Sequence, residues 1–150
     1  MPQSLSNILV HLTFSTKDRR ADIDGTIEPE LHHYLGGVCG EMGCQSLGVG
    51  GTPDHVHICV RLWRTVAVAD LVEEIKKRSS KWIKTQGPRC RYFTWQAGYG
   101  AFSIGQSGLA ALQAYIARQK DHHRRRDFKA EFRALLEKYE VAYDERYVWE

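Results

Sequence analysis

The segment GTPDHVHICVRL, residues 51–62, combines a turn signal with a strict alternation of side chains. From residue 55 onward every second residue is apolar, which is the pattern of a β-strand whose successive side chains point to opposite faces of a sheet. His55 and His57 therefore point the same way, with Cα atoms about 6.5–7 Å apart. Two imidazoles at that spacing can bind one metal ion, or they can be an ordinary pair of half-exposed strand residues. The opposite, apolar face of the strand carries Val56, Ile58, Val60 and Leu62.

The preceding residues predict further strands. QSLGV, residues 45–49, has the composition of a short strand, and the turn GGTPD joins it to the histidine strand in a hairpin. ILVHLTF, residues 8–14, alternates in the same way and predicts another strand. His11 lies on the face of that strand opposite its apolar residues. There it either borders a pocket or is an ordinary structural histidine.

Helical patterns separate these strands. Apolar residues recur at helical spacing from Leu31 to Met42 and from Val68 to Ile83. RYFTWQAGYGAFSI, residues 91–104, predicts a strand and a loop, with room for a second short strand. Ser107 and Asp127 are candidate N-caps of a third and a fourth helix. The order β-α-β-β-α-β-α predicts one α/β (α+β) domain over residues 1–150, a ferredoxin-like or RRM-like sandwich with an antiparallel sheet.

Composition sets limits on the class of protein. The 150 residues are 43% hydrophobic and 26% charged, as in ordinary globular domains. No apolar run approaches the roughly 20 residues of a membrane helix, and the N-terminus lacks the pattern of a signal peptide. The four cysteines form no CxxC pair, so we expect reduced thiols in a cytoplasmic protein. A net charge of +3 permits a polyanionic partner without requiring one.

A second group of polar residues lies in LQAYIARQKDHH, residues 112–123. If this segment is one helix, Tyr115, Gln119 and His122 share a face at positions i, i+4 and i+7. That face lies beside the apolar stripe of Leu112 and Ile116. The arrangement suggests a nucleophile next to a metal ligand, although a tyrosine that packs its ring on a sheet and leaves its hydroxyl in water would give the same pattern.

Together these residues resemble a known family. His55-Val56-His57 resembles the HUH motif (His, hydrophobic, His), and Tyr115 with Gln119 resembles the tyrosine helix of the single-tyrosine transposases of the IS200/IS605 type. This group includes the transposases associated with repetitive extragenic palindromes. The resemblance covers nearly the whole chain. It continues through HLTFSTKDR at 11–19, GTPDHVHICVRL at 51–62, WQAGYGAFSI at 95–104, YIARQKDHHRRR at 115–126 and YDERYVWE at 143–150.

The resemblance implies a mechanism. His55, His57 and Gln119 would hold a divalent cation, Mg²⁺ or Mn²⁺, and Tyr115 would attack a phosphodiester to form a 5′-phosphotyrosine and a free 3′-hydroxyl. The substrate would be single-stranded DNA marked by hairpins, with no membrane involved. The working unit would be a homodimer in which Tyr115 of one subunit can complete the histidine site of the other. Because imidazoles suit Mn²⁺ better than Mg²⁺, we expect Mn²⁺ to support at least as much activity.

Basic residues suggest where DNA could bind. One group lies on the second helix and another follows the tyrosine, and such stripes can track a phosphate backbone, although most are simply solvated helix faces. The candidate DNA contacts are Lys76, Lys77, Arg78, Lys81, Arg118, Arg124 and Arg125.

Two residues depart from the family pattern. Ala97 stands where many relatives carry an acidic residue, and Arg118 stands where relatives often have asparagine. Neither is a residue to which we assign the metal. Two other functions fit parts of the sequence: a domesticated, non-catalytic protein that binds hairpin DNA, and a metal-dependent phosphodiesterase acting on small nucleotides. Retention of Tyr115, His55, His57 and Gln119 together argues against the non-catalytic alternative.

Overall fold

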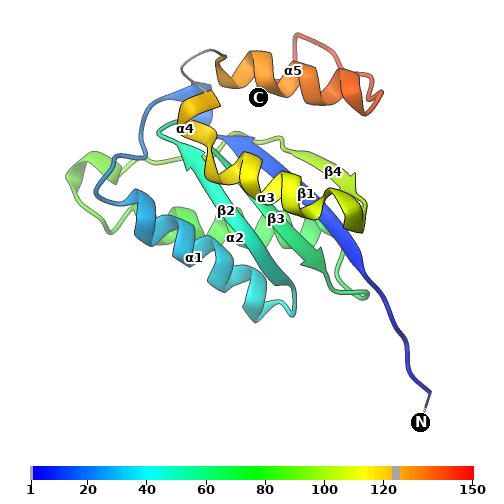
Figure 1. Cartoon of the computed structure of the whole chain (residues 1–150). Helices are drawn as coiled ribbons and strands as arrows, with labels where there is room; N and C mark the ends of the chain where they lie inside the picture. Colours follow the sequence, from blue (N-terminus) through cyan, green and yellow to red (C-terminus); the bar gives the residue numbers. More distant parts are fainter. Residues whose placement is uncertain (1, 123–125) are drawn as a thin grey trace.

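The computed structural model describes residues 2–122 and 126–150, apart from the side chain of His122. Four antiparallel strands form one sheet in the order β2-β3-β1-β4, which confirms the predicted α+β architecture and its element order (Figure 1). No helix in these residues has the length and apolarity that a membrane span requires. The strands and helices are β1 (Ile8–Ser15), α1 (Glu28–Glu41), β2 (Gln45–Thr52), β3 (His55–Leu62), α2 (Val68–Ile83), β4 (Gly100–Ile104), α3 (Leu109–Ala117), α4 (Gln119–His122) and α5 (Phe128–Lys138).

The sheet is covered on both faces. The apolar face of β3 packs into a core that includes residues of α1 and α2, such as Leu35 and Ile75. The opposite face packs under α3 and α5, where Cys59 contacts Leu112 and Ile116, and Phe102 contacts residues of α5. Figure 1 shows α2 behind the sheet and α3 in front of it. The face that carries the two histidines is therefore an interior layer, not a solvated surface.

Two glycines allow the covering helices to approach the sheet. A Cβ on Gly50 in β2 would collide with the carbonyl oxygen of Ile116 near the end of α3. A Cβ on Gly100 in β4 would collide with the ring of Phe132 in α5. Side chains at these two positions would push the helices outward. The glycines therefore fix how deeply α3 and α5 sit over the histidine face.

Several local predictions are corrected. The segment after Leu112 is not one helix, because Arg118 leaves helical geometry (φ −105°, ψ 22°) and separates α3 from α4. Ser107 does not cap α3; it lies in a short 3₁₀ turn, and Gly108 occupies the N-cap position. Asp127 does cap α5, since its side chain accepts a hydrogen bond from the Ala130 amide. In residues 91–104 the structure forms β4 and one isolated bridge between Thr16 and Trp95.

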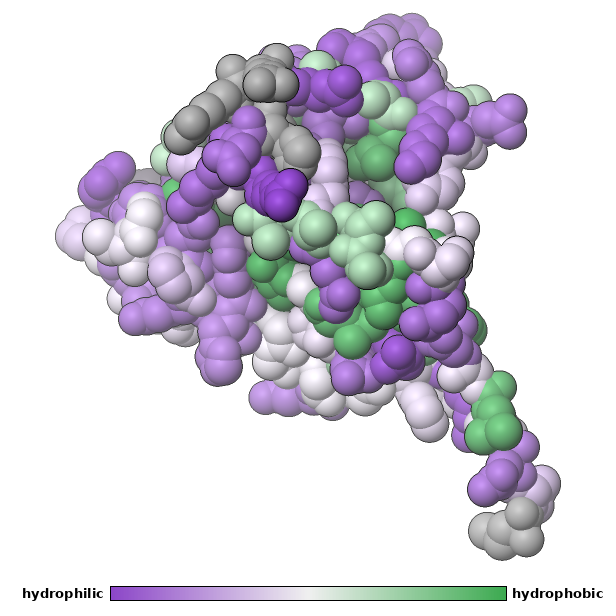
Figure 2. Space-filling view, viewed as in Figure 1, coloured by the Kyte–Doolittle hydropathy of each residue, from purple (hydrophilic) through white to green (hydrophobic). Residues whose placement is uncertain are grey.

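The outer surface of the α3 layer is mixed in character. Apolar atoms gather around α3 and hydrophilic side chains surround them (Figure 2). Leu47 and Ile104 are partly buried apolar residues beside α3, and Leu109 and Tyr115 are partly buried residues of α3 itself. The four cysteines are buried and free, in agreement with the prediction of reduced thiols.

Candidate metal and nucleophile site

His55 and His57 lie side by side on β3, with both side chains fully buried. Nε2 of His57 lies 2.7 Å from Oε1 of Glu131, and Nε2 of His55 lies 3.7 Å from the same oxygen. The two imidazoles therefore converge on one point, as the alternation of β3 predicts. The alternative of half-exposed strand histidines is wrong, because α3 and α5 cover this face of the sheet.

The other ring nitrogen of each histidine also has a polar neighbour. Nδ1 of His55 lies 2.6 Å from Oδ1 of Asp54 and 2.8 Å from the hydroxyl of Thr52. Nδ1 of His57 lies 2.7 Å from Nε2 of His11. Histidines that bind metals usually donate their second N–H to such an acceptor, which fixes the tautomer and the ring orientation. The surroundings of both rings match that pattern.

His11 is suited to the role of acceptor. Burial, together with the nearby His57, lowers the pKa of His11 to about 3. Its imidazole is therefore neutral near pH 7 and can accept a hydrogen bond from the Nδ1–H of His57. In that tautomer the lone pair of His57 is on Nε2, the atom that faces the site. His11 is thus a buried histidine in contact with His57 and also part of the lining of a pocket, so each of the two alternatives for it is partly correct.

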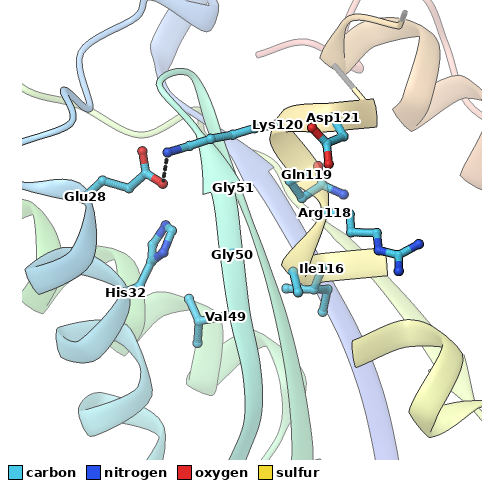
Figure 3. Close-up of a pocket in the computed structure, with 11 residues that line it drawn as sticks. Glu28, His32, Val49, Gly50, Gly51, Ile116, Arg118, Gln119, Lys120 and Asp121 are labelled. Atoms are coloured by element: carbon cyan, nitrogen blue, oxygen red, sulfur yellow. Dashed lines mark ion pairs between the residues drawn. The ribbon is translucent and has the colours of Figure 1, made fainter. Parts of the chain in front are cut away.

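Gln119 joins the cluster from the first residue of α4. The residue is 1% exposed, and its Oε1 lies 3.1 Å from Nε2 of His55. Arg118 separates α3 from α4, so Tyr115 and Gln119 belong to different helices. Figure 3 shows Gln119 at the beginning of α4, beside a pocket across which Lys120 reaches Glu28 of α1.

Tyr115 lies close to the histidines of its own chain. Its hydroxyl donates a hydrogen bond to Oε2 of Glu131, and its ring centroid is 5.8 Å from that of His57. Burial, together with the adjacent Glu131 carboxylate, raises the pKa of the Tyr115 hydroxyl well above its ordinary value. The hydroxyl is therefore protonated at neutral pH.

Glu131 is the residue that the sequence analysis missed. It lies on α5 with 2% exposure and contacts both histidines and Tyr115. A signal was present: Phe128, Glu131, Phe132 and Leu135 follow one another at helical spacing, so the carboxylate falls within the apolar stripe of the helix. A charged residue at such a position is rarely buried without a partner or a function.

The donor set fits a divalent cation. Ligand atoms of His55, His57 and Glu131 lie within 4.8 Å of one another, and Gln119 adds an amide oxygen next to His55. Two imidazole nitrogens with oxygen donors suit Mn²⁺ and other first-row divalent metals, and they suit Mg²⁺ less well. The residues predicted from the sequence are thus brought together, with one carboxylate added.

The predicted DNA contacts fall in different places. Those on α2 lie on the side of the sheet opposite the histidines. Lys76 donates hydrogen bonds to the carbonyl oxygens of Gln96, Ala97 and Gly98, and Arg78 pairs with Glu74 and Glu41. Lys77, Lys81 and Arg118 are exposed. Arg124 and Arg125 lie outside the described residues.

The fold and the site indicate that this chain is of the class of single-tyrosine, HUH-type transposases. The features are a four-stranded antiparallel sheet, two buried histidines on an inner strand and a tyrosine on a covering helix. The chain belongs to the IS200-like transposase family: the family's sequence profile, described as "Transposase IS200 like", matches residues 4–119.

Similar proteins agree with this assignment. The ISDra2 transposase TnpA of Deinococcus radiodurans is 23% identical over 116 residues, covering 74% of this chain and 83% of the relative. A crystal structure of a Deinococcus radiodurans R1 protein assigned as a transposase matches with a TM-score of 0.62 at 20% identity, covering 79% of this chain and 98% of the other. A REP-associated tyrosine transposase bound to a REP hairpin matches with a TM-score of 0.61 at 17% identity, covering 82% and 72%. Because the two solved structures are only 20% and 17% identical to this chain, these matches establish its fold alone.

Proposed function

We propose that this transposase cleaves and rejoins single-stranded DNA at hairpin-marked ends through a covalent 5′-phosphotyrosine on Tyr115. The observation that carries the proposal is that the Tyr115 hydroxyl and the imidazoles of His55 and His57 meet at one buried carboxylate within a single chain. Family membership supports DNA transposition, and a structural relative is bound to a REP hairpin.

The chemistry is a reversible transfer of a phosphoryl group. Oη of Tyr115 forms a bond to phosphorus, the bond from phosphorus to the 3′-oxygen breaks, and the leaving oxygen takes a proton from water. The phenolic proton passes to the Glu131 carboxylate, which already accepts its hydrogen bond. The tyrosyl ester retains the energy of the phosphodiester, so a second 3′-hydroxyl can reverse the step without ATP.

His55, His57 and Gln119 are the residues proposed to hold the divalent cation, Mg²⁺ or Mn²⁺. When bound, such a cation neutralises charge that develops on the scissile phosphate. Asp54 and His11 hold the two imidazoles in orientation through their Nδ1 atoms. The fixed rings limit the motion of the ligands during the reaction.

A pocket beside Tyr115 supports an unpaired strand as the substrate. It lies between β4, α3 and α5, and its lining includes His11, Ser103, Tyr115, Lys138 and Tyr139. An aromatic ring offers a stacking surface for a base that is not paired, and a lysine offers a charge for a phosphate. The pocket reaches the nucleophile, so a nucleotide bound in it would place a phosphodiester beside the Tyr115 hydroxyl.

The homodimer implied by the resemblance is retained as part of the proposal. The contacts between Tyr115 and Glu131 lie within one chain and favour two complete sites per dimer. A dimer in which each subunit lends its tyrosine to the other is the alternative arrangement.

The test uses the full chain and single-stranded oligonucleotides taken from the DNA that flanks its own gene. After incubation with Mn²⁺, a denaturing gel is examined for a protein band that carries a 3′-end label of the oligonucleotide. A covalent adduct is the expected result. Hairpin binding without an adduct would indicate the non-catalytic DNA-binding alternative, and hydrolysis of small nucleotides without an adduct would indicate the phosphodiesterase.

A further inference from the structure

Glu131 divides its two carboxylate oxygens between the metal ligands and the nucleophile. Oε1 lies 2.7 Å from Nε2 of His57 and 3.7 Å from Nε2 of His55, whereas Oε2 accepts the hydrogen bond of the Tyr115 hydroxyl. Ligands that each bind one ion at about 2.0–2.2 Å lie no more than about 4.4 Å apart. Oε1 therefore lies close enough to both Nε2 atoms for all three atoms to bind the same ion.

The position of Glu131 is fixed by packing. The N-cap hydrogen bond of Asp127 begins α5 just before it, and Phe128 packs its ring against His55 at a centroid distance of 4.9 Å. Phe132 fits over Gly100 on the other side. Glu131 is 2% exposed. Its carboxylate points at the histidines because the packing of Phe128 and Phe132 fixes the orientation of α5. This helix lies beyond residues 4–119, the part matched by the family profile.

We propose that Glu131 is a ligand of the divalent cation alongside His55 and His57, and that its other oxygen holds the Tyr115 hydroxyl in position for attack. The inference rests on the proposed function, which supplies the cation. It assigns to α5 a direct part in the active site. One carboxylate then sets the distance between the cation and the nucleophile, because both are bound to the same rigid group.

The first test measures Mn²⁺ binding to the full chain without DNA, by electron paramagnetic resonance titration. Glu131→Gln, which keeps the shape but removes the charge, is expected to weaken binding by about 10-fold or more, as loss of a group in a metal site commonly does. Glu137→Gln, on the exposed side of the same helix, is the matched control and should bind like the wild type. Tyr115→Phe should also bind like the wild type, because the hydroxyl is not proposed as a ligand.

The outcomes separate this inference from the proposed function. No Mn²⁺ binding by the wild type would remove the cation from the proposed function itself. Wild-type binding that Glu131→Gln leaves unchanged would overturn only the role of Glu131 as a ligand. Circular dichroism melting checks that the variants are folded. If Glu131→Gln is unfolded, Glu131→Met, which fills a similar volume but removes the carboxylate, takes its place, and wild-type affinity in that variant would overturn the proposal.

The second test concerns Tyr115. Adduct formation is timed at a saturating Mn²⁺ concentration, so that the loss of affinity no longer matters. Glu131→Gln is expected to remain about 100-fold slower, because the tyrosine has lost its carboxylate partner. Recovery of the full rate at saturating Mn²⁺ would overturn the second part of the proposal. A rate above that of the wild type would overturn it as well, since it would show that the carboxylate obstructs the tyrosine.

Discussion

Tyr115 donates its hydroxyl hydrogen bond to Glu131 of the same chain, and the other oxygen of Glu131 contacts His57. Tyr115 and the histidine strand are therefore connected within one subunit. The connection is made by α5, which follows α3 and α4 in the sequence. The ring of Phe132 in α5 packs against β4. A dimer is not needed to bring the tyrosine to the histidines.

The first prediction concerns complementation. Tyr115→Phe and His57→Ala proteins, each inactive alone, are mixed and assayed for strand cleavage. We expect no recovery of cleavage. If each site is formed within one chain, every subunit in the mixture still carries one of the two substitutions in its own site. Subunit exchange is verified separately with tagged chains. Partial recovery in a mixture that exchanges would show that the tyrosine serves the partner's histidines.

The second prediction concerns the nucleophile. Tyr115→Phe should abolish the covalent adduct and strand cleavage, while hairpin affinity changes by less than about 3-fold, since only one oxygen atom is removed and the ring stays packed. Gel shifts measure binding, and denaturing gels measure cleavage. Tyr99→Phe is the control. This tyrosine lies outside the site, so the variant protein should cleave DNA at the wild-type rate. Cleavage that survives in Tyr115→Phe would require a different nucleophile.

Much of the site could be predicted from short-range sequence patterns. The alternation of β3 places His55 and His57 on one face, and the spacing of four residues between Tyr115 and Gln119 marks them as a pair. The same alternation left open whether the histidines were half-exposed or part of a site, and both are fully buried. A strand pattern separates two faces, but it does not reveal that α3 and α5 cover the polar one, since that depends on elements about 50 to 75 residues later in the chain.

Glu131 and the break at Arg118 were not predicted for related reasons. An acidic residue on a helix is normally solvated, and only the packing of Phe128 and Phe132 on the sheet turns this one inward. No glycine or proline marks the break between α3 and α4, so a local pattern favours one continuous helix. In both cases contacts distant in sequence decide the local geometry.

The third prediction concerns the metal. Removal of divalent cations with a chelator should stop cleavage, and added Mn²⁺ should restore at least as much activity as the same concentration of Mg²⁺. The reason is the proposed set of ligands, in which His55 and His57 would supply two imidazole nitrogens that Mg²⁺ binds poorly. Initial rates of cleavage across a titration of each ion make the comparison. Full activity in the presence of the chelator would exclude a role for the cation. Clearly higher activity with Mg²⁺ than with Mn²⁺ would contradict the proposal that two imidazoles bind the cation.

The fourth prediction concerns Lys76. Its ammonium group donates hydrogen bonds to three successive carbonyl oxygens, Gln96, Ala97 and Gly98, so we expect a structural role in place of DNA binding. Lys76→Met should lower the free energy of unfolding by about 1–3 kcal/mol, because those carbonyls lose a charged donor. Lys81→Met, at an exposed position on the same helix, should change stability by less than about 0.5 kcal/mol. Chemical denaturation compares the two, and equal stabilities would show that the carbonyl contacts matter little.

The fifth prediction concerns Gly50, which sets the distance between β2 and the end of α3. A Cβ at this position would collide with the carbonyl oxygen of Ile116 and with its side chain. Gly50→Ala should therefore displace the segment that carries Tyr115 and Gln119, reduce stability by about 1–3 kcal/mol and slow adduct formation. Gly37→Ala provides the matched control: Gly37 lies within α1, and a Cβ there would meet no atom within 4 Å. Alanine has the higher helix propensity, so this control should be as stable as the wild type or up to about 1 kcal/mol more stable. Thermal melts and single-turnover cleavage are measured for both variants, and a Gly50→Ala protein with wild-type stability and rate would show that α3 does not depend on this close approach.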